Sequence, residues 1–274
     1  MLEGLDQIDW KSRDAENVPD LIRGIVSKDK ETRSRAHELF EHKVVLGGES
    51  FETTDLGYGI ASIFRTDLLL VVLPFLIELL NEDQVPAKGE ILYDVKWMSE
   101  FVRLKPAGEI YHERARQLRA AIWANSDTYI RLLHDQDADT RIEVVFLLIE
   151  FMGEQGQFIF FSILHQLEVE TDLTVKREIL WILHLGLTKH PEVRSTVLDP
   201  YVKFLRQVFA PDQEIALRRV AAVCLIEALK SDAPPEAREM LQDFMMQKPE
   251  FTLLPYYYLI DFWSAVSDIL DSSV

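Results

Sequence analysis

The sequence predicts an all-α protein of about six or seven antiparallel helix pairs, stacked into a helical solenoid (an α-α superhelix) that spans residues 1–274 as one domain. A spaced pattern of an acid, a base four residues later, and apolar or small residues at seven, eight, eleven and twelve occurs three times. The copies begin at Asp137, Asp172 and Glu214, 35 and 42 residues apart. A period in this range is typical of helical solenoids. A helix-like apolar run precedes each copy, and no segment shows the alternation of a strand.

Each copy has the sequence of an amphipathic helix with an acid as its N-terminal cap. The bases are Arg141, Lys176 and Arg218. Residues three and four apart share a helical face, so the later positions form one apolar stripe per copy. A carboxylate before the first turn accepts hydrogen bonds from free backbone N–H groups and suits the positive end of the helix. The stripes consist of Val144, Val145, Leu148 and Ile149, of Ile179, Leu180, Leu183 and His184, and of Ala221, Ala222, Leu225 and Ile226.

A fourth copy lies near the start of the chain. It begins at Asp29, has Arg33 and Phe40 in matching positions, and follows a leading helix at Leu21–Val26. It starts 108 residues before Asp137, which is close to three periods, so we expect divergent repeats between them. The clearest repeats cover residues 17–46, 127–153, 157–188 and 198–230.

The front half of the chain alternates helix-like runs with Gly and Pro breaks. Residues 1–16 are a short acidic lead-in, and Pro19 suits the first turn of a helix. Breaks follow at Gly47-Gly48, at the glycines 57 and 59, and at Lys105–Gly108. The helices predicted between these breaks cover residues 18–26, 29–42, 68–80, 91–104 and 109–123.

In the rear half, shorter runs at 129–133, 158–167 and 201–208 are the first helices of the three clear pairs. Pro234-Pro235 opens a helix to residue 246, Lys248-Pro249 breaks the chain again, and a last helix runs from about 254 to 270. Aromatic residues on that helix either close the core of the last repeat or form a binding patch. They are Tyr256, Tyr257, Tyr258, Phe262 and Trp263.

The acid, base and paired-residue pattern resembles the HEAT repeat, including the repeats of the phycobilin lyase group. Front segments at Ile8–Trp10, Val18–Leu21, Phe51–Thr54 and Leu73–Leu80 are similar to bacterial HEAT-repeat proteins, which mostly have no assigned function. The resemblance covers most of the chain and implies that second helices line a concave surface. Two departures lie in the second copy, where Lys176 replaces the usual Arg and His184 replaces a small residue.

Composition favours a cytoplasmic protein. The single cysteine, Cys224, allows no disulfide within the chain and falls on an apolar helix side, where a small core residue is expected. The first residues lack the basic region and apolar core of a signal peptide. The most apolar run, Leu68–Leu80, is shorter than the roughly 20 residues that span a bilayer.

The net charge of −17 excludes some partners and favours others. Nucleic-acid binding depends on Lys and Arg that neutralise phosphates, and anionic membranes repel an acidic surface. A basic protein is attracted by the same charge. The alternative is that the charge serves solubility alone.

Motifs for catalysis are absent from the sequence. His37-Glu38 and His112-Glu113 are dipeptides of the kind that bind iron in di-iron HEAT-like hydroxylases, but they lie in unlike contexts and we interpret them as coincidence. No H-E-x-x-H, P-loop or G-x-S-x-G motif occurs. We assign no catalytic residue, metal ligand or cofactor.

Two sets of acids are candidates for partner contact. The first set lies at the turns within the repeats and forms an acidic edge if the turns stack. The alternative is that each turn holds one N-cap and neighbouring acids that are merely solvated. The second lies on the second helices and forms an acidic concave wall, the alternative being a solvated face. The edge set is Asp135, Asp137, Asp139, Glu168, Glu170, Asp172, Asp212 and Glu214, and the wall set is Glu143, Glu150, Glu178 and Glu227.

The sequence therefore favours a non-enzymatic module that binds another protein, with an immunity-type inhibitor of a basic toxin as a sharper form. An enzyme of the phycobilin-lyase-like class and an assembly scaffold are the alternatives. The sequence does not determine the oligomeric state.

Overall fold

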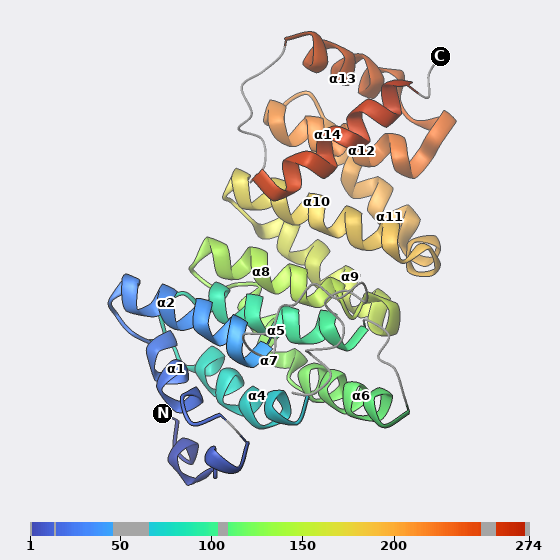
Figure 1. Cartoon of the computed structure of the whole chain (residues 1–274). Coiled ribbons are helices and arrows are strands. Elements are labelled where there is room, and N and C mark those ends of the chain that lie inside the picture. The colour runs from blue at the N-terminus through green and yellow to red at the C-terminus, as the bar shows by residue number, and fades with distance from the viewer. Residues whose placement is uncertain (1, 14, 46–65, 104–108, 248–255, 272–274) are drawn as a thin grey trace. The chain divides into compact units, whose positions relative to one another are not determined.

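The computed structural model describes residues 2–13, 15–45, 66–103, 109–247 and 256–271, which contain helices and no strand (Figure 1). The all-α prediction is confirmed for this part of the chain. The chain divides into two compact units, Met1–Glu150 and Phe151–Val274. A single superhelix across both units stays a prediction.

The first unit starts with two short 3-10 helices and continues with longer helices. α4 carries Pro74 in its interior. The elements are η1 (Leu5–Gln7), η2 (Lys11–Arg13), α1 (Val18–Ile25), α2 (Lys30–Phe40), the π-helix η3 (Glu41–Val45), α4 (Thr66–Asn81), α5 (Lys88–Arg103), α6 (Glu109–Trp123), α7 (Ser126–Leu132) and α8 (Ala138–Ile149).

Helix pairs form the core of the first unit. α1 packs on α2, α4 packs on both α5 and α6, and α5 packs along α8. The apolar stripe predicted on the copy at Asp137 is buried, because Val144, Val145 and Leu148 have no exposed surface. The contact between α5 and α8 links the pair of α4 and α5 to the pair of α7 and α8, while the stacking of regular repeats stays a prediction.

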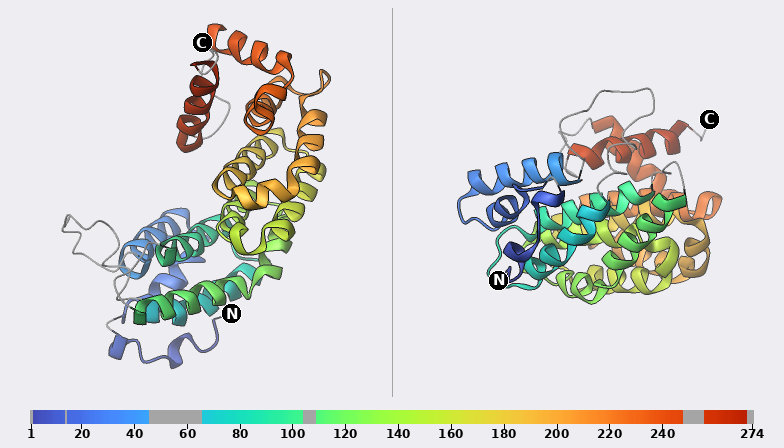
Figure 2. Two further views of the ribbon diagram at one scale, coloured as in Figure 1. Left: turned by 90° about the vertical axis from the view of Figure 1, so that its right-hand side faces the viewer. Right: turned by 60° about the horizontal axis from the view of Figure 1, so that its bottom comes forward.

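The second unit has longer helices. They are α9 (Met152–Val169), α10 (Leu173–Lys189), α11 (Pro191–Phe209), α12 (Ile215–Leu229), η4 (Lys230–Asp232), α13 (Pro235–Gln247) and α14 (Tyr256–Asp271). α10 packs against α12 and α12 against α14, while α9 packs against α11. Figure 2 shows the antiparallel course of α9 to α12 within this unit.

All four predicted N-caps are confirmed. The Asp29 side chain accepts from the N–H of Thr32, and Asp137 accepts from that of Thr140. In the second unit, Asp172 caps α10 and Glu214 caps α12 by accepting from two backbone N–H groups each. The four helices therefore begin where the sequence pattern places them, because a carboxylate there satisfies donors that the helix leaves unpaired.

Each repeat base reaches back to the turn before its acid. Arg33 donates to the Ser27 carbonyl and Arg141 donates to the Asp135 carbonyl. Lys176 donates to the Glu170 carbonyl at 3.4 Å, and Arg218 donates to the Phe209 carbonyl. The base thus ties the turn to the first helical turn, and Lys176 performs this role although Arg is usual at its position.

Two helices begin about six to ten residues earlier than the sequence predicts, at Met152 and Pro191. Gly153 and Gly156 in α9, and Pro200 inside α11, obscured the helical pattern. The expectations for Phe51–Thr54, for the glycines 57 and 59, for Lys105–Gly108 and for Lys248-Pro249 lie outside the described residues, as do those for the side chains of 256–258. Phe262 is buried against Trp181 and Trp263 stacks on Phe244, so these two rings help to close the core.

Candidate functional site

Some acids of the edge predicted at the turns form hydrogen bonds and ion pairs with nearby residues. The Asp135 carboxylate accepts from the N–H of Asp137 and lies 3.6 Å from the buried Nζ of Lys88. Glu170 is buried and accepts from the Gln166 amide and from the N–H of Asp172. These carboxylates organise the turns between helices, which matches the alternative interpretation of caps.

The remaining acids of that edge are exposed, except Glu214, which is partly buried, and apolar side chains lie among them. Asp139, Glu168 and Asp212 are exposed. In the second unit, apolar residues next to the turn acids stay 45–50% exposed. These residues are Val169, Leu173 and Ile215. The edge in the second unit is therefore mixed, with carboxylates beside exposed apolar side chains.

A groove between α12 and α13 extends this edge. Its apolar part is Ile215 and Met240, and three exposed acids of α13 border it. The volume is about 280 Å³. The Arg219 guanidinium, which also lines the groove, lies over the Phe244 ring at 4.3 Å. The acids are Glu236, Glu239 and Asp243.

The turn edge and the groove form one surface of the second unit. Arg177 lies one turn after Leu173, and its Nη1 is 4.0 Å from the Glu214 carboxylate beside Ile215. The starts of α10 and α12 therefore lie side by side, and Ile215 belongs to both features. We call this surface the acidic face. It consists of Val169, Leu173, Ile215 and Met240 with Glu168, Asp172, Asp212, Glu214, Glu236, Glu239 and Asp243.

The four acids predicted for a concave wall lie within helix packing. Glu150 and Glu178 are buried, so they offer little surface to a partner. Glu143 is half-buried on α8, and its burial, opposed by the charge of Lys96, raises the pKa of its carboxyl to about 7. Glu227 is held by His184. Sequence periodicity alone does not reveal this burial and pairing, and the role of the four acids in binding stays a prediction.

A polar cluster lies inside the second unit around His184, which is 2% exposed. Its Nε2 is 2.6 Å from Glu227 Oε2 and its Nδ1 is 3.1 Å from the Tyr201 hydroxyl oxygen. Burial opposes protonation, but the Cys224 thiol and the Glu227 carboxylate outweigh it and raise the pKa of His184 to about 9. The pKa of Glu227 is lowered, first by its hydrogen bond from His184. The cluster is therefore a buried ion pair at neutral pH.

A second buried histidine lies in the first unit. His37 Nδ1 is 2.8 Å from Asp94 Oδ2, and burial raises the pKa of Asp94 to about 6. His37 faces the packing side, as its position in the repeat predicts. His112 lies outside the described side chains, and the described residues hold no group of three or more His, Cys, Asp or Glu placed to bind a metal. None of the helices in the described ranges combines the length and apolar composition needed to cross a bilayer.

The α13 acids and the exposed apolar residues are the part of the surface that sequence reasoning missed. Glu236, Glu239 and Asp243 recur at three- and four-residue spacing, so they share a helical face. That spacing was a usable signal. The exposure of Leu173 and Ile215 was not, because each directly follows a capping acid and its direction depends on packing with the next repeat.

Replacing Asp172 tests its role as the N-cap of α10. We expect Asp172→Ala to lower the free energy of unfolding by about 1 kcal/mol, since two N–H groups of α10 lose their acceptor, whereas Asp172→Asn keeps a capping oxygen and most of the stability. Urea denaturation followed by circular dichroism measures both. An Asn variant as unstable as the Ala variant would contradict the capping role.

No family model and no curated protein sequence matches this chain. Among solved structures, an engineered protein is similar, with 15% sequence identity, 94% of this chain and 97% of that chain covered, and a TM-score of 0.45. A likeness at this level carries no argument about function, and the resemblance to HEAT repeats stays an interpretation of the sequence pattern.

Proposed function

We propose that this protein is a non-enzymatic binding module and that its acidic face holds a basic protein. The observation that supports it most is the groove between α12 and α13, where Ile215 and Met240 lie among Glu236, Glu239 and Asp243. A partner segment with Lys or Arg around one apolar side chain matches this arrangement. The net charge of −17 would raise the rate at which such a partner associates.

The exposed apolar residues are the reason why the acidic face suits a protein partner better than solvent alone. A solvated acidic helix face needs no apolar side chains, yet Val169, Leu173 and Ile215 remain about half exposed beside it. Burying them on binding supplies a non-directional attraction, while the carboxylates select the sign of the partner's charge. An inhibitor of a basic toxin is a finer form of this proposal.

The test uses a labelled peptide of alternating lysine and leucine and the triple variant Glu236→Gln, Glu239→Gln and Asp243→Asn. We expect the dissociation constant to rise about tenfold, since three exposed charge contacts at roughly 0.5 kcal/mol each sum to one decade. Fluorescence anisotropy at low and moderate salt measures the binding.

The matched control is Glu16→Gln, Glu31→Gln and Glu38→Gln, which removes the same charge from exposed positions of the first unit. The control should bind the peptide like the unaltered protein. Equal weakening in both triple variants would show that the peptide senses only net charge and would contradict a defined site. An unchanged constant in the groove variant would contradict it as well.

A further inference from the structure

The second unit carries a second groove of opposite character, at the other end of α12. It lies between α11 and Leu229 and has a volume of about 550 Å³. Its floor is apolar, formed by Leu198 and Val202 with Leu229. Lys203, Arg206 and Gln207 supply hydrogen-bond donors, and Asp199 is the single acid that lines it.

The cations of this groove are exposed and lack partners in the described structure. Neither Lys203 nor Arg206 forms a hydrogen bond or an ion pair with another described residue. Other cations of the same unit are engaged, because Arg194 donates to the Glu227 carbonyl and Arg238 donates to the Ile269 carbonyl. Two uncommitted cations on one helix, in an acidic chain, leave donors available to an anion.

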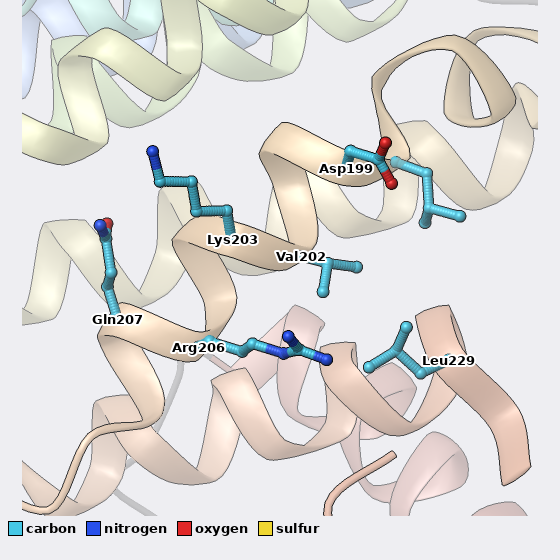
Figure 3. A pocket seen from close by; sticks show the side chains of 7 residues that line it. Asp199, Val202, Lys203, Arg206, Gln207 and Leu229 are labelled. Carbon is cyan, nitrogen blue, oxygen red and sulfur yellow. The ribbon is translucent and has the colours of Figure 1, made fainter. Parts of the chain in front are cut away.

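The side chains in the groove are arranged for an amphiphilic ligand. Figure 3 shows Arg206 extending from α11 towards Leu229, with Val202 beside it. Lys203 and Gln207 project to the other side of α11 (Figure 3), so Arg206 is the cation that faces Leu229. An anion on the guanidinium would therefore place an attached apolar group over Val202 and Leu229.

We propose that this groove binds an acidic peptide segment in which an apolar side chain neighbours a carboxylate. The guanidinium of Arg206 matches a carboxylate with two parallel hydrogen bonds. Asp199, one turn before Lys203, would repel a doubly charged phosphate more strongly than a singly charged carboxylate. The groove is open rather than enclosed, which suits a peptide segment better than a small molecule that needs to be surrounded.

The experiment uses a labelled peptide of alternating glutamate and leucine at about 0.15 M salt, where repulsion from distant acids is screened beyond about 8 Å. We expect saturable binding by the full chain, a loss of about tenfold in affinity for Arg206→Gln, and a smaller loss for Lys203→Gln. A peptide with serine in place of leucine should bind more weakly.

The control variant is Lys30→Gln with Arg35→Gln, which removes one Lys and one Arg from exposed positions of α2. It should bind the peptide like the unaltered protein, and circular dichroism checks that each variant is folded. Absence of saturable binding, equal loss in the control, or binding of inorganic phosphate through Arg206 without binding of the peptide would overturn the proposal. The lysine-leucine peptide and the α13 variants report separately on the acidic face.

Discussion

Glu227→Gln is expected to destabilise the second unit by up to about 3 kcal/mol near pH 6.5, because it removes the carboxylate that pairs with a buried imidazolium. His184 is buried and donates to Glu227 at 2.6 Å, while the Glu227 side chain itself is 26% exposed. The Tyr201 hydroxyl accepts from the other ring nitrogen, and burial raises the pKa of Tyr201 well above its usual range, so it stays protonated. Urea denaturation of variant and unaltered protein gives the difference.

The effect of the substitution should depend on pH. The pKa of His184 is about 9 in the folded protein and about 6.5 in the unfolded chain. The folded state thus binds the proton more tightly, so the contribution is fully present below pH 6.5 and is lost as pH rises through 9. The shift corresponds to about 3 kcal/mol at most. We therefore expect the two proteins to converge in stability towards pH 9.

Two controls assign this dependence to the carboxylate. Glu239→Gln removes the same charge from an exposed site of α13 and should change stability by less than about 0.5 kcal/mol at any pH. Cys224 also faces His184 and raises its pKa. The Glu227 carboxylate is 26% exposed and carries a negative charge more favourably than the fully buried Cys224 thiol, so the gap between Glu227 and Gln should persist in a Cys224→Ala background. A gap that disappears there would assign the charge to the thiol.

The sequence predicted the local features of the fold because local rules govern them. Asp29, Asp137, Asp172 and Glu214 cap helices through N–H groups two or three residues away, so their role depends on spacing within one turn. The buried stripes follow from helical periodicity in the same way. The helix start at Pro191 was missed, because a helix that carries polar residues and an internal proline is recognised mainly by its packing.

The candidate site and the buried pairs could be predicted only in part. His184 and Glu227 are 43 residues apart, and no single-repeat pattern brings them together. The sequence indicated that His184 departs from the repeat and that Glu227 lies on a second helix, but not that each neutralises the other. Likewise, Ile215 stays 46% exposed in the groove between α12 and α13, which the pattern of a single repeat does not reveal.

Gly156→Ala is expected to destabilise the second unit by about 1–3 kcal/mol, although the same change in an exposed helix usually stabilises by about 1 kcal/mol. A Cβ at Gly156 would lie 2.4 and 2.5 Å from the two Cγ atoms of Val193, closer than packed carbon atoms approach. Val193 is buried where α9 packs on α11, so it has little room to move. Gly156 therefore allows the close crossing of these helices.

A double-mutant cycle tests that explanation. Val193→Ala removes both Cγ atoms, so the added methyl group should then fit, and the double variant should be more stable than the sum of the single effects by at least about 1 kcal/mol. Gly153→Ala is the matched comparison one turn earlier. Its Cβ would meet the ring of His190 at 3.1 Å, and this half-buried side chain can rotate away, so we expect a smaller loss. Additive effects, or a stabilising Gly156→Ala, would contradict close packing of α9 on α11 as the reason for glycine.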